Sequence, residues 1–212
     1  MVEATLSESS LAFTEEWAQA NDPTAAARER AREIGCEPIS AAAGATLRLL
    51  AAASGARAIV EVGTGAGVSG LWLFEGMRPD GVLTTIDVEA EHQRAAKEAF
   101  TEHGIASTRF RLINGPATEV LPRLTDSAYD IVFIDADTAS NAVYHDQAVR
   151  LLRPGGIVAF YGALWQDRVA NSSARDADTL AQRELAKTVR DDERLSSCLI
   201  AVGDGLLLGV KN

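Results

Sequence analysis

The sequence predicts a doubly wound α/β fold, in which a mostly parallel β-sheet is covered by helices on both faces. From residue 57 onward, short apolar runs rich in Val and Ile alternate with helical segments, a pattern that calls for a parallel sheet buried on both sides. Right-handed crossovers would then place the helices in two layers. The last two apolar runs have no room for a helix between them, so the chain is expected to end in an antiparallel hairpin and to contain seven strands.

The first fifty-five residues are expected to form helices that precede the sheet. Their alanine-rich stretches end at Gly35 and Gly55, and glycine suits the left-handed position that follows a helix. Asp22 is the expected cap of the second helix, with Pro23 at its first helical position. The three expected helices cover residues 11–20, 22–35 and 40–55.

The remaining elements follow from the alternation itself. Each expected strand is short and apolar, and each expected helix is longer and mixed in polarity. The strands are expected at residues 57–62, 82–87, 109–115, 129–136 and 156–161, followed by a hairpin within 195–211 that turns at 203–205. The helices between them are expected at residues 68–77, 89–104, 116–124, 141–156 and 176–192.

Length and composition predict one soluble globular domain. A chain of 212 residues with 47% hydrophobic and 24% charged side chains suits a single well-buried unit over residues 1–212. We divide it into N-terminal helices over 1–55 and an α/β core over 56–212. The net charge of −10 repels phosphate backbones, so nucleic acid is not an expected partner.

The cysteines and the N-terminus predict a cytoplasmic protein. Cys36 and Cys198 lie far apart and outside any metal-binding or redox motif, which favours packing roles in a reducing compartment. The N-terminal stretch is acidic and lacks the basic and apolar segments of a secretion signal. No window approaches eighteen apolar residues, so we expect no membrane span.

A glycine-rich loop is the strongest functional signal. In "EVGTGAGVSG", Gly63, Gly65 and Gly67 directly follow the first expected strand, and a helix is expected from Val68. Glycines let the backbone turn sharply and approach a ligand at the carboxyl edge of the sheet, where doubly wound folds bind ligands. Three alternating glycines exceed what a tight turn alone requires, so the loop predicts a bound cofactor.

A carboxylate at the end of the second strand narrows the class of cofactor. Asp87 can accept hydrogen bonds from both ribose hydroxyls of an adenosine-containing cofactor, or it can cap the helix that follows. The loop also spells the dinucleotide motif GxGxxG from Gly65 to Gly70, which alone is a weak signal. Glu61 lies where a pyrophosphate would be repelled and the ammonium group of a methionine could be bound. S-adenosylmethionine is therefore favoured over a nicotinamide cofactor, which stays open as the alternative.

From about residue 24 to its end, the sequence resembles the class I S-adenosylmethionine-dependent O-methyltransferases of the catechol and caffeoyl-CoA type. The resemblance is closest to a bacterial branch of that family. The segments that carry it are "EVGTGAGVSGLWL", "GVLTTIDVEAEH", "YDIVFIDAD", "LLRPGG" and "VGDGLLL". The resemblance implies a Rossmann-like core, methyl transfer to an oxygen of a small acceptor such as a phenol, and a homodimer.

Carried over residue by residue, the resemblance implies a set of cofactor contacts. Methionine-side contacts come from the glycine loop, Asp135 and the preceding helix, and adenosine-side contacts come from the second strand and a later loop. The implied residues are Ala43, Glu61, Gly63, Thr64, Gly65, Ser69, Asp87, Val88, Ala117 and Asp135. In this family the adenine loop usually reads Gly-Asp-Ala, whereas this chain has Pro116 in the middle position. The acceptor for the adenine amino group is therefore missing.

The catalytic end departs further from the family. Its metal-dependent members use the first Asp of a DAD motif, an adjacent Asp and Asn after the next strand, and a lysine as base. The matching positions here are Asp135, then Tyr161 and Gly162, with Thr138 in place of the lysine. A hard divalent ion prefers several oxygen ligands, commonly two carboxylates, so we expect no metal at this position.

Without metal and lysine, the sequence leaves three candidates for a catalytic base. Asp135 is the first, followed by Tyr161 and His145. Asp137 is expected to cap the next helix, and His92 is expected to face solvent. A cofactor-binding protein that has lost transfer chemistry, and a metal-dependent transferase for nucleotide sugars, stay open as further alternatives.

Overall fold

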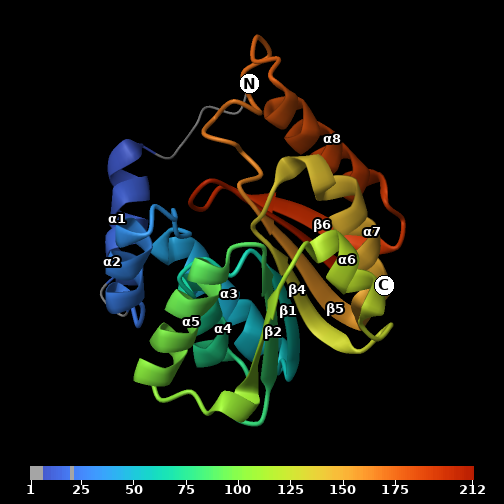
Figure 1. Cartoon of the computed structure of the whole chain (residues 1–212). Helices are drawn as coiled ribbons and strands as arrows, with labels where there is room; N and C mark the ends of the chain where they lie inside the picture. The colour runs from blue at the N-terminus through green and yellow to red at the C-terminus, as the bar shows by residue number, and fades with distance from the viewer. Residues whose placement is uncertain (1–6, 20–21) are drawn as a thin grey trace.

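A seven-stranded sheet forms the centre of the computed structural model, which describes residues 7–19 and 22–212 (Figure 1). The strands are β1 Ala58–Val62, β2 Val82–Asp87, β3 Phe110–Asn114, β4 Tyr129–Ile134, β5 Leu152–Tyr161, β6 Leu195–Ile200 and β7 Leu206–Lys211. Their order across the sheet is β3-β2-β1-β4-β5-β7-β6. The first five strands are parallel, and β7 runs antiparallel to both β5 and β6. The predicted doubly wound fold with a terminal hairpin is confirmed.

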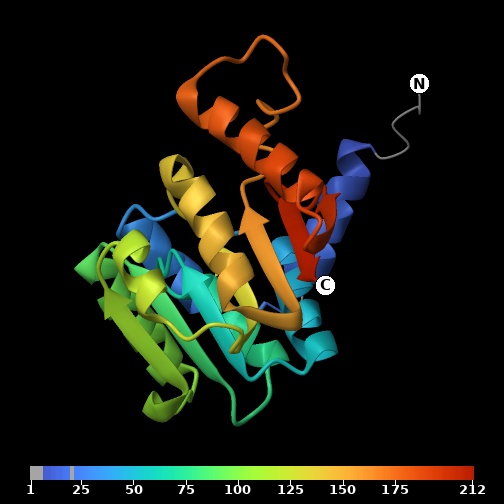
Figure 2. The same ribbon diagram turned by 90° about the vertical axis from the view of Figure 1, so that its right-hand side faces the viewer.

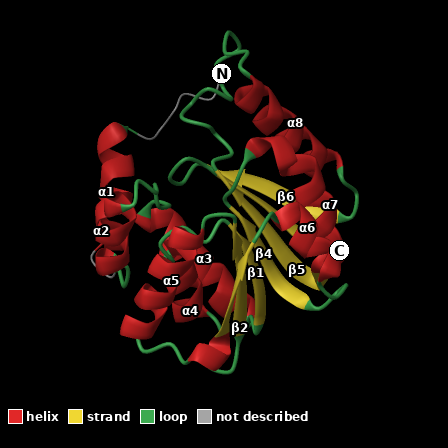
Figure 3. Cartoon of the chain, in the orientation of Figure 1, coloured by secondary structure: helices red, strands yellow, loops and turns green. Residues whose placement is uncertain are grey.

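Helices cover the sheet on both faces, as Figure 3 shows. The α-helices are α1 Glu8–Gln19, α2 Ala25–Glu33, α3 Ala41–Ser54, α4 Val68–Gly76, α5 Ala90–Glu102, α6 Ala117–Val120, α7 Asn141–Leu151 and α8 Ala177–Asp191. Three short 3₁₀ turns are η1 Ser107–Arg109, η2 Leu121–Arg123 and η3 Thr138–Ser140. In Figure 2, turned by 90°, α7 and α8 lie over one face of the sheet and extend past the ends of its strands.

The alternation of side chains along each strand divides the core into two layers. Ile59 of β1 packs with α3, α4 and α5, whereas Val60 and Val62 of the same strand pack with α6, α7 and α8. Successive strand residues point to opposite faces of a sheet, so Glu61 points to the same face as Ile59. A carboxylate is thereby placed in the layer beneath α4.

The strand order places a topological switch point between β1 and β4. From β1 the chain continues to β2, which pairs with β1 on one side, whereas β4 pairs with β1 on the other side. Doubly wound sheets bind ligands in the crevice that opens at the carboxyl ends of such strands. The residues that follow β1, β2 and β4 therefore meet at one edge.

Several boundaries differ from those expected from the sequence; for example, α1 begins at Glu8 instead of Leu11, and the helix expected over 116–124 is divided into α6 and η2. The helix expected over 141–156 ends at Leu151, and β5 begins at Leu152 with an irregularity in its pairing to β4. The second helix begins at Ala25 with Thr24 as its N-cap, so the expected cap at Asp22 and helical position for Pro23 are wrong. The Asp22 carboxylate instead accepts the Thr24 N–H at 2.7 Å. Among the helices of the described residues, none is long and apolar enough to cross a membrane.

Candidate active site

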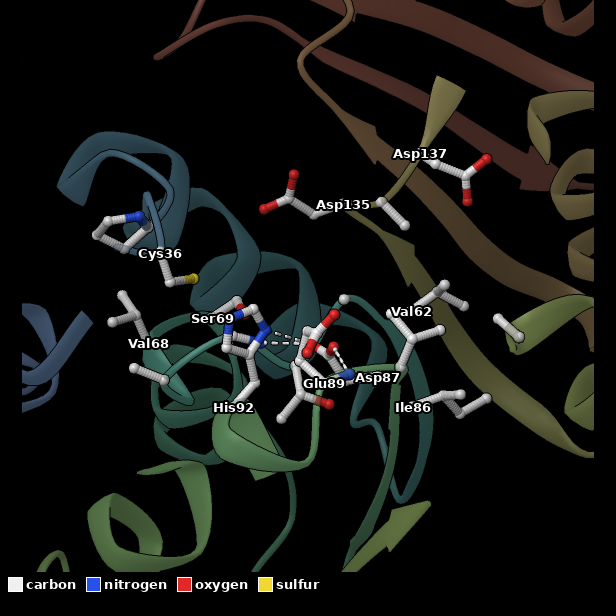
Figure 4. Close-up of a pocket in the computed structure, with 18 of the residues that line it drawn as sticks. Cys36, Val62, Val68, Ser69, Ile86, Asp87, Glu89, His92, Asp135 and Asp137 are labelled. Atoms are coloured by element: carbon white, nitrogen blue, oxygen red, sulfur yellow. Dashed lines mark hydrogen bonds and ion pairs between the residues drawn. The ribbon is translucent and has the colours of Figure 1, made fainter. Parts of the chain in front are cut away.

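A cavity of about 310 Å³ lies at the carboxyl edge of the sheet, over the ends of β1, β2 and β4 (Figure 4). This volume is at the lower end of the range for small-molecule sites. Of the residues implied by the sequence, eight line it: Gly63, Thr64, Gly65, Ser69, Asp87, Val88, Ala117 and Asp135. The structure therefore brings together residues that lie more than seventy positions apart in the sequence.

The glycine loop is packed against the end of β4. Gly63 has φ +92°, and a Cβ atom placed on it would lie 1.9 Å from the backbone oxygen of Asp135. The Gly63 N–H donates to Ile86 O at 2.9 Å, and the Asp135 N–H donates to Val62 O at 2.9 Å. A side chain at position 63 would push these three strand ends apart. Glycine is thus required for the edge of the sheet to close beneath the cavity.

Asp87 is held firmly, with one acceptor position left. Its Oδ1 accepts the Glu89 N–H at 2.9 Å, and its Oδ2 accepts the Gly65 N–H at 3.0 Å and lies 3.1 Å from His92 Nδ1. A carboxylate has about four lone-pair sites, so three are in use. The present arrangement can accept one ribose hydroxyl, and a second one only if the His92 ring moves. The N-cap of α5 is Glu89 rather than Asp87.

His92 is a pocket residue that the sequence reasoning missed. It lies in the first turn of α5 and lines the cavity. Its side chain is 24% exposed, so it is more buried than expected. Its ring nitrogen contacts the Asp87 carboxylate at 3.1 Å. The available signal was the spacing of five residues between Asp87, which ends a strand, and His92. This spacing puts His92 in the first turn of the next helix, above the acid.

The wall of the cavity that precedes α3 was also missed. The segment Cys36–Ile39 lines the cavity, whereas Ala43, which was expected to flank the methionine, is fully buried in the core within α3. Ala43 does not line the cavity, because it lies on the face of α3 that packs into the core. Burial raises the pKa of the Cys36 thiol above its usual value.

Glu61 lies beneath the cavity rather than in its wall. Its side chain is fully buried, its Oε1 accepts the Ser69 hydroxyl at 2.6 Å, and its Oε2 accepts the Thr85 hydroxyl at 2.6 Å. Burial raises the pKa of Glu61 to about 7, against the lowering effect of the two hydroxyl donors. Contact between Glu61 and a ligand is therefore indirect and passes through Ser69, which does line the cavity.

The two acids of the DAD segment point in different directions, as Figure 4 shows. The Asp137 carboxylate accepts the Ser140 N–H at 2.9 Å, which caps η3, and the Tyr144 hydroxyl at 2.6 Å. The expected capping role of Asp137 is confirmed. The Asp135 carboxylate points into the cavity, and no donor of the described residues bonds to it. Burial, with the charge of Asp204, raises the pKa of Asp135 to about 7.

Tyr161 stands at the end of β5, next to the cavity but outside its wall. Its hydroxyl oxygen accepts the N–H groups of Ser40 and Asp204, each at 3.3 Å. These contacts join the start of α3 to the turn of the β6–β7 hairpin, which reaches toward the N-terminal helices in Figure 1. Burial raises the pKa of Tyr161 above its usual value, so this phenol is protonated at neutral pH and can donate its proton in a hydrogen bond.

His145 does not belong to this site. It is 3% exposed on α7, and its Nε2 lies 3.2 Å from Asp192 at the end of α8. The cavity wall does not include it. Its candidacy as a base is therefore wrong, because this position on α7 faces α8 and not the sheet edge. Burial lowers the pKa of His145.

The residues present do not fit the divalent metal of the family. In the described part of the chain, no group of three His, Cys, Asp or Glu side chains is arranged to hold a metal ion. Thr138, at the position of the family lysine, is buried and donates its hydroxyl to Asp178 of α8. Tyr161 uses its oxygen to accept two backbone N–H groups. At the positions of the second carboxylate and the amide stand Tyr161, whose oxygen has these partners, and Gly162, which has no side chain, so the ligands that a hard cation prefers are missing.

The residues present do fit an adenosine cofactor with a methionine end. Asp87 keeps a free acceptor position, Val88 lies exposed on the cavity wall, and the N–H of Ala117 opens the α6 helix, where no intrahelical acceptor exists. At the other end, the unpartnered carboxylate of Asp135 suits a cationic group. The cavity thus offers one end that suits adenosine and one anionic end, at Asp135, that suits a cationic group.

Comparison with known proteins agrees with this geometry. The profile of the O-methyltransferase family matches residues 25–212. A Mycobacteroides abscessus protein named as a candidate O-methyltransferase is 52% identical over 211 residues, which cover 100% of this chain and 96% of that protein. The chain therefore belongs to the O-methyltransferase family, and the family predicted from the sequence is confirmed.

Solved structures give the same answer. The O-methyltransferase TomG of Streptomyces achromogenes, crystallised with S-adenosylmethionine, is 26% identical with a TM-score of 0.84, over 100% of this chain and 99% of that chain. A Corynebacterium glutamicum protein is 29% identical with a TM-score of 0.87, over 94% of this chain and 96% of that chain. These relatives give no support to the nicotinamide alternative.

Proposed function

We propose that this protein transfers a methyl group from S-adenosylmethionine to an oxygen of a small acceptor such as a phenol, without the metal ion of its metal-dependent relatives. The observation that carries the proposal is the carboxylate of Asp135, which points into the cavity beside the glycine loop and has no hydrogen-bond donor in the part of the chain that the structure describes. Family membership supplies the reaction class, and the cavity supplies the place for it.

The cofactor, when bound, supplies an electrophilic methyl group on a sulfonium. The glycine loop would hold its methionine part, and Asp87, Val88 and Ala117 would hold its adenosine part. Positioning acceptor and methyl in line supplies much of the acceleration of such a displacement. The chain's task is to orient the two reactants and to exclude water between them.

Asp135 has the properties of a general base for the acceptor hydroxyl. Burial and the charge of Asp204 raise its pKa to about 7, and a catalytic base works best when its pKa is near the operating pH. One carboxylate oxygen can face the cationic end of the cofactor while the other takes the acceptor proton. Tyr161, protonated and anchored by Ser40 and Asp204, would hold the wall beside it.

Binding and turnover test different parts of the proposal. We expect S-adenosylmethionine, and not NADH, to raise the melting temperature, with the same shift in Mg²⁺ and in a chelator. With a phenol that is methylated, Asp135→Asn should lower kcat by about 100-fold, the usual contribution of a positioned base. A shift caused only by NADH would refute the cofactor. Binding of S-adenosylmethionine without methyl transfer to any phenol or catechol would refute the proposed enzymatic activity. The protein would then be a non-catalytic cofactor-binding protein.

We further propose that the protein is a homodimer that uses α1. Leu11, Phe13 and Trp17 of this helix are 47%, 66% and 63% exposed, an unusual gathering of large apolar side chains on one short element. The Glu15 carboxylate accepts the N–H groups of Ala41 and Ala42 and so ties α1 to the start of α3. Sedimentation should give a dimer, and Trp17→Glu should give a monomer that still folds.

We also propose that residues 1–212 form one domain and that the protein acts in the cytoplasm. The Arg30 guanidinium of α2 binds Glu102 of α5 at 2.9 Å, which joins the N-terminal helices to the core. Cys36 and Cys198 are unpaired, as suits a reducing compartment.

A further inference from the structure

A chain of hydrogen bonds runs beneath the glycine loop and ends at Glu61. Gln93 Nε2 donates to Thr64 Oγ1 at 3.0 Å, Thr64 Oγ1 lies 2.7 Å from Thr85 Oγ1, and Thr85 donates to Glu61 Oε2 at 2.6 Å. On its other side, Glu61 Oε1 accepts the Ser69 hydroxyl at 2.6 Å. All five residues of this chain are less than 9% exposed. Four of them are uncharged polar residues, and the fifth is the acid Glu61.

The direction of this chain is fixed by Gln93. The same Nε2 atom also donates to the carbonyl oxygen of Ile113 at 3.2 Å, and a carbonyl can only accept, so this atom is the amide nitrogen. Thr64 therefore accepts from Gln93, and Thr85 is the only acceptor among the described residues for the proton of Thr64. Thr85 must in turn give its single proton to Oε2 of Glu61.

This direction leaves one place on Glu61 for a proton. Oε2 already receives the Thr85 proton, so a proton there would put two hydrogens into one short contact. Oε1 faces only the Ser69 hydroxyl. A proton on Oε1 would be donated to Ser69 Oγ, and the Ser69 proton would then be free to point into the cavity that this residue lines.

Charge decides which end of the cofactor meets Ser69. Ser69 is the second residue of α4, whose N-cap Gly67 offers no side-chain cap, and the N–H groups of a helix start attract an anion. Across the cavity, Asp135 is a carboxylate without a donor, which attracts the ammonium group and repels a second carboxylate. The carboxylate of the cofactor's methionine end therefore belongs at Ser69, which must donate a hydrogen bond to it.

We propose that Glu61 takes up a proton from solvent when the cofactor binds, so that Ser69 can donate to the cofactor carboxylate. The proton enters at Oε1, Oε1–H donates to Ser69 Oγ, and Ser69 O–H donates into the cavity. Glu61 is then a positioning residue that acts through Ser69. The inference rests on the proposed function, because it requires that the cavity bind a ligand with an amino-acid end.

Within residues 7–19 and 22–212, no cation acts on Glu61 to keep it ionised. The charged groups that act on it are Asp87 at the end of β2 and Asp135 at the end of β4, and both favour the protonated form. The covering helices face it with the Ser69 hydroxyl of α4 and, through the threonines, the Gln93 amide of α5. Its pKa of about 7 makes proton uptake measurable above neutral pH.

Calorimetry with S-adenosylhomocysteine tests the proposal on the full chain. This probe keeps the carboxylate, the ammonium and the adenosine and lacks the sulfonium charge. Titrations at pH 8 in buffers of different ionisation enthalpy count the protons bound with the ligand. We expect uptake close to one proton for the wild type and none for Glu61→Gln, whose amide donates to Ser69 permanently.

The pH dependence separates Glu61 from Asp135. Above pH 7 the wild-type affinity should fall by up to about tenfold per pH unit, because the ligand must then pull a proton onto Glu61. Below pH 7 it should also fall, because Asp135 must lose a proton to face the ammonium. Glu61→Gln should remove only the alkaline decline, and Asp135→Asn only the acidic one.

The outcomes discriminate clearly. Equal proton uptake in the wild type and in Glu61→Gln would overturn the inference while leaving the proposed function intact. Absence of binding in all variants and in the wild type would instead refute the proposed function. If Glu61→Gln does not fold, Ser69→Ala decides, because it keeps the acid and removes the hydroxyl that carries the effect. It should bind about tenfold more weakly with no proton uptake, whereas unchanged uptake would contradict the proposal.

Discussion

The two halves of the cavity differ in how their polar groups are satisfied. In the cofactor half, Glu61 accepts two hydroxyl groups and Asp87 contacts three donors. In the acceptor half, the carboxylate of Asp135 has no donor among the described residues and faces the charge of Asp204. Asp135 is half-buried, and a partly desolvated charge without a partner is destabilising, so a ligand that supplies a donor to it would stabilise the acceptor half.

Backbone conformation differs between the glycine loop and the turn that follows β5. Beyond β5, the consecutive residues Trp165, Gln166 and Asp167 have φ of 49°, 51° and 62°, a region that residues with a side chain seldom adopt. The Gln166 N–H donates to Asp204 Oδ1 at 2.6 Å and helps to hold this turn. In the cofactor half, the positive φ values of the loop fall on glycines. The glycine loop of the cofactor half is thus free of this strain, whereas the turn that contacts Asp204, outside the cavity wall, is held in a strained form.

The contact that joins the two halves offers the largest test of this contrast. Gly63→Ala would place a Cβ atom 1.9 Å from the backbone oxygen of Asp135 at φ +92°. Overpacking and the positive φ together should lower the free energy of unfolding by about 3 kcal/mol or more. Urea unfolding followed by tryptophan fluorescence gives the stability, and calorimetry gives the loss of cofactor binding.

Gly104→Ala is the matched control for this substitution. Gly104 has φ +76°, and nothing lies within 4 Å of a Cβ atom placed there. It should cost only about 1 kcal/mol, the price of the positive φ alone, and leave binding unchanged. Equal losses in the two variants would show that the closeness of Gly63 to Asp135 does not matter for stability.

A smaller effect is expected when the unpartnered charge is removed. The folded state raises the pKa of Asp135 from 3.8 to about 7, so the stabilisation from its protonated form is complete below pH 3.8 and is lost as the pH rises through 7. Asp135→Asn keeps this stabilisation at every pH, because an amide does not ionise. The variant should match the wild type near pH 4 and be more stable by about 1 to 3 kcal/mol at pH 8, a range that allows for solvent screening.

Urea unfolding at several pH values between 4 and 8 measures this difference. Glu16→Gln removes an exposed carboxylate of α1 and serves as the control, with no comparable gain at pH 8. A variant that is less stable than the wild type at pH 8 would mean that Asp135 has a partner in the folded protein. The two halves would then not differ in the way described here.

The sequence could predict the cofactor half because its residues are local. Gly63 and Asp87 each end a strand, and the carboxyl ends of neighbouring parallel strands must meet at one edge. Their chemistry therefore follows from position within one strand-to-helix connection. Asp135 was predictable for the same reason, since it ends the strand on the other side of β1.

Residues outside this rule could not be placed from the sequence. Which turn of a helix faces the cavity depends on where the helix begins, so Ala43 was expected in the wall that the segment Cys36–Ile39 forms. His145 lies only ten residues after Asp135, yet α7 turns it toward Asp192. The burial of Glu61 beneath Ser69 depends on the packing of α4 against the sheet, which periodicity alone does not fix.

The smallest expected effect concerns the adenine side of the cofactor half. Pro116 is the N-cap of α6, with φ −61° and ψ 126°, and provides no side-chain cap. These angles are accessible to aspartate, whose carboxylate could accept the amino group of adenine next to Ala117. Pro116→Asp should tighten S-adenosylhomocysteine binding by about tenfold, the value of one added hydrogen bond to a charged group.

The gain must depend on the adenine amino group if this account is right. S-inosylhomocysteine carries an oxygen in place of that amino group, so Pro116→Asp should bind it no more tightly than the wild type does. Pro116→Ala, which removes the ring without adding an acceptor, should bind both ligands as the wild type does. A similar gain for both ligands would point to stabilisation of α6 by a better cap, because capping does not distinguish the two bases. Because Pro116 takes no part in the hydrogen-bond chain that ends at Glu61, proton uptake at pH 8 should stay as in the wild type.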